Sequence, residues 1–234
     1  MLVRGRSLRV TVRRSRYRSL ASLQRDNRVC RACAEAGFPL ESWPILEGRL
    51  SQKAYILGQA PGSVEAVERR PWRGRAGQTL RGWLGLDEDE FYSLFYCASV
   101  MRCYPGRSPT GRGDRAPTPR EQELCRFWRE WEFRLLQPRL IVPVGILAAK
   151  QLLGIRSLGE CIGESFGVGE ALAVPLPHPS GRNTWLNDRT NRARLESATT
   201  LIRDELARFN LDRDRPHPPA GRPFPEHGTP QKRG

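Results

Sequence analysis

The stretch Ala54-Tyr-Ile-Leu-Gly58-Gln-Ala-Pro-Gly62 decides the fold that the sequence predicts. Its first five residues form a short apolar run that ends in turn-forming residues, which is typical of a buried strand. The glycines and the proline that follow fix a tight loop at the carboxyl end of that strand, where backbone N–H groups can approach a ligand closely. The loop is not a phosphate-binding P-loop, because no Gly-Lys-Ser/Thr follows. Taken alone, such a loop is more often a plain turn than a site.

Further apolar runs predict strands within 91–100, at 140–145 and at 171–176. Helical patterns separate them, and the clearest begins at Thr118-Pro-Arg-Glu121, which has a capping-box pattern with proline at the first helical position. This alternation predicts a three-layer α/β/α sandwich with a central, mostly parallel four-stranded sheet. In such sheets, ligands bind at the carboxyl ends of the strands.

Composition predicts one folded domain and a polyanionic partner. The chain has 234 residues, of which 39 are Lys or Arg and 25 are Asp or Glu, so its formal net charge is +14. Nucleic acid is the natural partner for that excess. We expect a basic, disordered or DNA-contacting arm at 1–24, a single domain at 25–210, and a disordered Pro/Arg-rich tail at 211–234. We expect the protein to be a monomer.

No apolar run is long enough to cross a membrane, which needs about 18 residues or more. The Arg-rich start, Met1 to Leu20, lacks the apolar stretch of a secretory signal, although its Arg and Ser content can mimic an organelle transit peptide. We therefore expect a cytoplasmic protein of bacterial type that associates with the nucleoid. In that reducing compartment disulfides are disfavoured, and clustered cysteines suggest metal.

The cysteines predict such a site. Cys30-x-x-Cys33 has metal-binding spacing, and Cys103 and Cys125 supply two further thiols. Four thiolates suit either zinc or a 4Fe–4S cluster, and spacing does not separate the two. Ordinary partly buried cysteine is the alternative for Cys103 and Cys125. Cys97 and a sixth cysteine, at position 161, lie in apolar or glycine-flanked contexts and are interpreted as structural.

An aromatic and a histidine are the other candidates. Trp72 lies in a loop rich in glycine and arginine, where it could stack on a base while the arginines hold phosphates; packing under its own loop is the simpler interpretation of one aromatic. His178 follows the last predicted strand, between two prolines, and is the only histidine in 25–210. It can donate a hydrogen bond to charge that develops on a leaving group, and a purely structural loop histidine is the alternative.

Together these segments resemble the iron–sulfur branch of the uracil-DNA glycosylase superfamily, families 4 and 5. The resemblance covers about residues 28–205, and its motifs occur in the family's order. The motifs that carry it are Gly58–Gly62, Pro71–Gly77, Val100–Cys103, Glu121–Cys125 and His178–Ser180.

The resemblance implies a DNA base-excision repair glycosylase that flips a base and hydrolyses the N-glycosidic bond of uracil, or of another deaminated base, by a dissociative route. It implies a 4Fe–4S cluster in preference to zinc, on Cys30, Cys33, Cys103 and Cys125. The residues that would act in catalysis are His178 and Gln59. The residues that would bind the base are Gly58, Gln59, Ala60, Trp72, Ser99 and His178. The residues that would meet the DNA are Arg73, Arg75, Ser180, Gly181 and Arg182.

The sequence departs from the family at three places. Gln59 replaces the usual Glu, Ser99 replaces the Asn that reads the uracil edge, and the loop at 104–119 is longer than usual. A Ser hydroxyl has less reach than an Asn amide, so another deaminated base could be preferred. A non-catalytic binder of damaged or single-stranded DNA on the same fold is the alternative function. A zinc-stabilised basic protein unrelated to repair explains the charge and cysteines but not the ordered motifs.

Overall fold

The computed structural model describes residues 11–111, 113–181, 184–211 and 231–233. Within them the chain forms one six-stranded sheet with the strand order β2-β1-β3-β5-β4-β6. The strands are β1 (Ala54–Gly58), β2 (Phe95–Ser99), β3 (Leu140–Pro143), β4 (Ser165–Val168), β5 (Ala171–Ala173) and β6 (Gln231–Arg233).

The sheet is parallel around β1, as the sequence predicted. β1 pairs in parallel with both β2 and β3, and β3 pairs in parallel with β5. The predicted count of four strands was too low, because β4 and β6 add an antiparallel edge. β4 contains a glycine and β6 reads Gln-Lys-Arg, so neither has a strand pattern of its own, and pairing with a neighbour decides their conformation.

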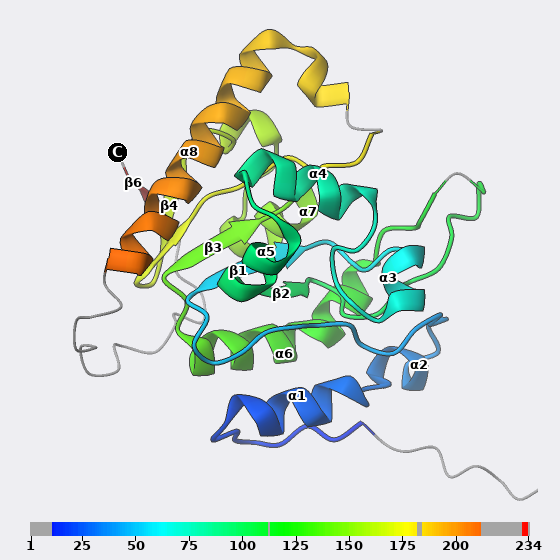
Figure 1. Cartoon of the computed structure of the whole chain (residues 1–234). Coiled ribbons are helices and arrows are strands. Elements are labelled where there is room, and N and C mark those ends of the chain that lie inside the picture. The colour runs from blue at the N-terminus through cyan, green and yellow to red at the C-terminus, as the bar shows by residue number, and fades with distance from the viewer. Residues whose placement is uncertain (1–10, 112, 182–183, 212–230, 234) are drawn as a thin grey trace, which may run out of the picture.

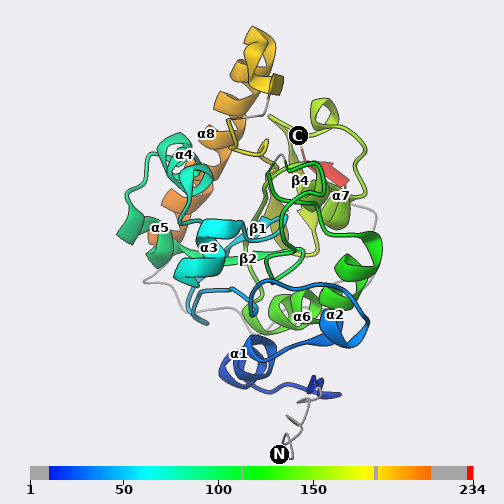
Figure 2. The same ribbon diagram turned by 90° about the vertical axis from the view of Figure 1, so that its right-hand side faces the viewer.

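Helices cover both faces of the sheet and give the predicted three layers. The helices are α1 (Leu20–Arg28), α2 (Ala32–Glu35), α3 (Ser63–Glu68), α4 (Arg75–Leu84), α5 (Glu88–Leu94), α6 (Pro119–Leu136), α7 (Ile146–Leu153) and α8 (Arg189–Leu211), with short 3-10 turns at Leu158–Glu160 and Thr184–Asn187. α6 and α7 share one face, where Gln151 donates a 2.8 Å hydrogen bond to Gln122. α4, α5 and α8 lie on the other face (Figures 1 and 2).

The folded part begins earlier than residue 25. Figure 1 shows α1 along the outer side of α6. Tyr17 is buried, and its ring centroid lies 5.4 Å from that of Trp131. Residues 17–24, which we expected in a disordered arm, therefore pack on the domain. Tyr17 is surrounded in the sequence by arginines, so no apolar periodicity predicts that it is buried. At the other end, α8 reaches Leu211 and residues 231–233 form β6; the rest of the expected tail lies outside the described residues.

α6 begins where the sequence predicted. The Thr118 hydroxyl accepts from the Glu121 N–H, and the Glu121 carboxylate accepts from the Thr118 N–H at 2.8 Å, which completes the capping box. The buried face carries Cys125, Trp128 and Glu132. Other apolar residues of the helix are only half-buried: Leu124, Phe127, Trp131 and Leu135. In the described part of the chain no helix is long and apolar enough to cross a membrane.

Candidate active site and cysteine cavity

The glycine-proline loop and the histidine motif meet at the carboxyl edge of the parallel strands. Gly58 ends β1 and pairs with Ser99, which ends β2. At the end of β3, the Gly145 N–H donates a 2.8 Å hydrogen bond to the Leu176 carbonyl, so the segment after β5 leaves the sheet at this same edge. His178 then packs on Gly145: a Cβ at Gly145 would lie 3.3 Å from the His178 Cβ.

Trp72 packs on the end of β1. A Cβ at Gly58 would lie 3.0 Å from Cζ2 of Trp72 and 3.1 Å from the Ser99 hydroxyl oxygen. Trp72 and Ser99, which we both expected to bind the base, therefore lie in the same small region. They can do so because Gly58 has no side chain to occupy that space. The indole is buried, as a packing role requires. The indole packs against the carboxyl end of β1, where a ligand is expected, and not only under its own loop.

The backbone of Trp72 is held in an unusual conformation. Its φ of +62° lies in the left-handed region, which is costly for a bulky residue, by about 1–3 kcal/mol. Arg81 Nη1 donates to the Trp72 carbonyl at 3.0 Å, and the Tyr92 hydroxyl donates to the carbonyl of Pro71. A Cβ at Gly77 would lie only 1.8 Å from the Trp72 carbonyl oxygen. Only glycine fits at position 77, which is part of the motif shared with the family, because any side chain there would overlap the Trp72 carbonyl.

Glu65, which the sequence analysis missed, joins the two loops. Its carboxylate accepts the Gly62 N–H at 3.0 Å and the Gly74 N–H at 2.8 Å. It thereby ties the loop after β1 to the loop that carries Trp72. The spacing Gly62-x-x-Glu65 is the reverse half of a capping box, and this signal could have been found from the sequence.

His178 is half-buried, and its charge state follows from that position. Burial lowers its pKa below the ordinary value, while the negative charge of Glu65 acts in the opposite direction and is the smaller effect. The imidazole is therefore neutral at neutral pH. A neutral imidazole still presents one N–H donor, which is what a departing anionic base needs.

The arginines of the Trp72 loop differ in what they can do. Arg73 is paired with Glu68 and Glu88, and Glu88 also receives Arg70 and Arg81. Its guanidinium therefore already has carboxylate partners, and the expectation that Arg73 meets DNA stays a prediction. The sequence could not show this, because Glu88 belongs to α5.

The other residues expected at the DNA are placed only in part. Arg75 is exposed at the first residue of α4, Ser180 is half-buried and Gly181 is exposed. Arg182 lies outside the described residues. Their contacts with DNA stay predictions.

The rest of the first loop continues the ladder between β1 and β2. The Gln59 carbonyl accepts from the Met101 N–H at 3.1 Å, and Gln59 and Ala60 are half-buried. Within the long loop, Arg107 and Asp114 form an antiparallel bridge, and Asp114 reaches the loop after β1. The Asp114 carboxylate accepts the Tyr104 hydroxyl at 2.9 Å, and a Cβ at Gly62 would lie 3.1 Å from Asp114 Oδ2. The extra length therefore lies beside the candidate site.

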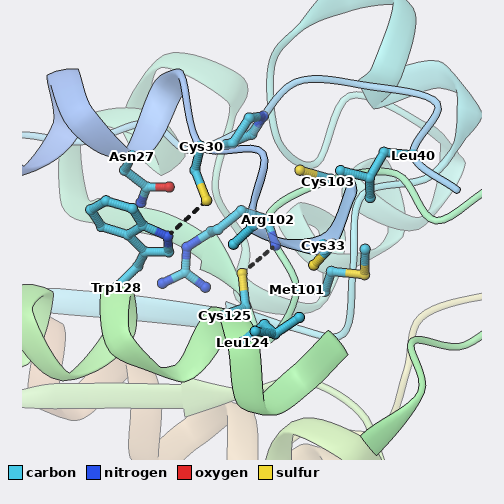
Figure 3. A pocket seen from close by; sticks show the side chains of 12 residues that line it. Asn27, Cys30, Cys33, Leu40, Met101, Arg102, Cys103, Leu124, Cys125 and Trp128 are labelled. Atoms are coloured by element: carbon cyan, nitrogen blue, oxygen red, sulfur yellow. Dashed lines mark hydrogen bonds between the residues drawn. The ribbon is translucent and has the colours of Figure 1, made fainter. Parts of the chain in front are cut away.

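The four cysteines expected to hold metal line one cavity (Figure 3). Cys30 and Cys33 come from the segment around α2, Cys103 from the chain after β2, and Cys125 from α6. All six cysteines are buried and none forms a disulfide. The residues that line the cavity with the four thiols are Asn27, Ala32, Leu40, Pro44, Met101, Arg102, Leu124 and Trp128. Cys97 and Cys161 do not line it, in keeping with a structural role.

The donors around this cavity fit a negatively charged thiolate group. Trp128 Nε1 donates to Cys30 Sγ, and the Arg102 backbone N–H donates to Cys125 Sγ, both at 3.3 Å. N–H groups that point at sulfur are the outer partners that metal thiolates use. Arg102 also keeps buried N–H groups for which the described residues offer no acceptor. Among the described side chains, no three Cys, His, Asp or Glu could hold a single metal ion.

Comparison with known proteins decides the family. Residues 46–201 match the family described as the uracil DNA glycosylase superfamily. The chain belongs to this superfamily. It is therefore a DNA glycosylase with DNA as its substrate, which confirms that prediction.

The relatives place it in the type-4-like branch. A type-4 uracil-DNA glycosylase of Thermotoga maritima is 28% identical over 168 residues, which cover 68% of this chain and 82% of that protein. One of Pyrobaculum aerophilum is 30% identical over 128 residues, covering 51% and 60% respectively. One of Sulfurisphaera tokodaii is 25% identical over 177 residues, covering 69% and 74%. The branch predicted from the motifs is thus confirmed.

Replacing Gly77 with alanine should displace Trp72, because the new methyl group would overlap the Trp72 carbonyl. We expect a lower free energy of unfolding and a changed tryptophan emission. Gly82→Ala is the matched control on α4: its Cβ would meet nothing within 4 Å, and it should stabilise the helix by up to about 1 kcal/mol. Equal stability of the two variants in urea would contradict this account of the loop.

The titration of His178 should have its midpoint below about 6.5, the value of a free histidine, because burial disfavours the charged imidazole. Glu65→Gln removes the neighbouring negative charge, so the midpoint should fall further. The measurement is the pH dependence of the imidazole NMR signals, assigned by comparison with His178→Asn. An unchanged midpoint in Glu65→Gln would show that Glu65 does not act on the ring.

Proposed function

We propose that this protein removes uracil from DNA in base-excision repair, by hydrolysing the N-glycosidic bond of a base flipped out of the helix. The observation that carries the proposal is the convergence of Gly58, Trp72, Ser99 and His178 at the carboxyl edge of adjacent parallel strands. The printed names of the relatives, type-4 uracil-DNA glycosylases, support the same substrate.

The residues at the edge divide the work of binding the base. Trp72 would offer its indole for stacking, since every base has a π-face. Backbone groups from Gly58 to Ala60, with the Gln59 side chain, would hold the carbonyl edge. Ser99 would face the edge that distinguishes one base from another. Because Trp72 is already held by Arg81 and by the close approach of Gly77, this wall would be in place before the base arrives.

His178 would stabilise the leaving group. In the dissociative route, the C1′–N bond breaks with its electron pair leaving on the base, and the sugar becomes an oxocarbenium ion. The neutral imidazole donates its N–H to the anionic base oxygen. Water then adds to C1′ and loses a proton to solvent. Glu65 already accepts two backbone hydrogen bonds, so its role is to hold the loops together rather than to activate this water.

Cys30, Cys33, Cys103 and Cys125 would hold a 4Fe–4S cluster. When bound, the cluster would link three separate segments of the chain covalently. It would not change its redox state during the reaction. This link would fix the segment after β2, and with it Ser99 at the end of β2, against α6 and the N-terminal part of the fold. Four thiols on one cavity, with N–H groups aimed at two of them, support this assignment.

Contacts with the DNA backbone would come from Ser180, Gly181, Arg182 and Arg75. The net charge of +14 supports phosphate binding as the main source of affinity. Arg73 would join only if a phosphate displaced Glu68 or Glu88. We infer that the protein acts as a monomer.

Ser99 favours a second candidate within the same reaction. Its hydroxyl is close to Gly58 and Trp72 and has less reach than an amide. Hypoxanthine or xanthine could then be excised in place of uracil. A set of oligonucleotides that each carry one deaminated base tests both candidates, since alkali-cleavable product identifies the excised base.

His178→Ala should retain the fold and DNA binding but lose base excision by about 100- to 1000-fold, because one donor to the developing charge contributes about 2.7–4 kcal/mol to the transition state. The measurement is single-turnover excision of uracil, with DNA affinity as the control. Full activity of this variant would rule out the proposed role. Absence of any excised base with the unmodified protein would favour the non-catalytic binder.

The purified protein should be brown, with broad absorbance near roughly 400 nm, as expected for cysteine-ligated iron–sulfur. Iron and acid-labile sulfide should be stoichiometric, and Cys30→Ala should lose both. Cys161→Ala is the matched control, since Cys161 is buried but does not line the cavity. A colourless protein purified without oxygen, with one zinc ion per chain, would contradict the cluster.

A further inference from the structure

A fully buried arginine adjoins the cysteine cavity. Arg102 lies between Met101 and Cys103 in the chain after β2, and its side chain is 0% exposed. Its Nη2 forms an ion pair with Glu132 of α6, which is also 0% exposed, and donates to the Tyr55 hydroxyl at 3.2 Å. The hydroxyls of Tyr55 and Tyr96 donate to the same carboxylate. Glu132 is therefore well satisfied, and it holds one corner of the guanidinium.

The opposite side of the guanidinium is not satisfied by the described residues. Nε and Nη1 of Arg102 are buried and have no hydrogen-bond acceptor among them. Buried donors in native proteins are almost always paired, so such atoms require an explanation. An ion pair that served only to fill the core would leave this penalty uncompensated, because burying charge is favourable only when the remaining donors are also met.

The position of Arg102 suggests the missing acceptor. The residue lines the cavity of the four thiols, and its backbone N–H donates to Cys125 Sγ. Figure 3 shows its side chain among Trp128, Cys30 and Cys125. An iron–sulfur group on four thiolates carries excess negative charge and accepts N–H hydrogen bonds at sulfur.

We propose that Arg102 is a positioning residue for the iron–sulfur cluster: Glu132 and Tyr55 hold one side of its guanidinium, and the other side supplies buried positive charge and N–H donors to the cluster and its thiolates. This inference rests on the cluster proposed above. Trp128 acts in the same sense, through its N–H on Cys30.

Two measurable consequences follow. Outer partners of metal sites typically change metal affinity by about 10- to 100-fold, so removing the guanidinium should accelerate loss of the cluster. Positive charge and N–H donors stabilise the more negative, reduced state of a cluster. Removing them should therefore shift the reduction potential to a more negative value.

The experiment uses the double variant Arg102→Met/Glu132→Gln, since either substitution alone would leave its partner as an unpaired buried charge. Arg126→Met, on a less buried side of α6, is the matched control. The readouts are the decay of absorbance near roughly 400 nm in chelator and the midpoint potential of the cluster. We expect the double variant to lose its cluster about tenfold faster than Arg126→Met and to have a more negative potential.

Arg102→Lys keeps the charge with fewer donors and should lie between the two, which keeps the test decisive if the double variant does not fold. Decay rates and potentials equal to those of Arg126→Met would overturn the proposal. Measuring iron and sulfide in the unmodified protein separates the cluster proposal from the proposal about Arg102. A protein without iron and sulfide would refute both. If the unmodified protein contains the cluster and the variants behave like it, only the role of Arg102 is refuted.

Discussion

Gly58 has no side chain, and the space that a Cβ would occupy there belongs to Trp72 and Ser99. The candidate site depends on this close approach, because it brings the ends of β1 and β2 and the following loop within contact distance. The parallel pairing of β1 with both neighbours then sets where the remaining groups arrive. His178 reaches the same edge because the chain after β5 follows β3 to its carboxyl end.

Charged side chains hold the loops of this edge in place. Glu65 binds two loop N–H groups, and Arg81 binds the carbonyl of Trp72. Each contact uses a charged side chain on a backbone group, which is stronger than a neutral hydrogen bond. The strained φ of Trp72 is tolerated because these neighbours over-determine it. A site prepared in this way needs little rearrangement when the base enters.

The cysteine cavity joins parts of the chain that the sheet alone would leave apart. α1 and α2 lie outside α6, and Cys30 and Cys33 reach from that layer toward Cys103 and Cys125. Arg102, which lines the cavity, forms a buried ion pair with Glu132 that connects the segment after β2 with α6. The end of β2, at Ser99, is therefore held in place in two ways: by pairing with β1 in the sheet and by the groups around the cavity.

The sequence by itself determined the local and periodic features. The strand at 54–58, the capped start of α6 at Thr118 and the order of the glycosylase motifs were all predicted, because each depends on neighbours within a few residues or on a recurring spacing. The tertiary structure alone decided the rest. Tyr17 joins the core, Arg73 of the loop before α4 pairs with Glu88 of α5, and β6 exists only as a partner of β4. Those outcomes depend on contacts between residues far apart in the chain, whose energies no local pattern encodes.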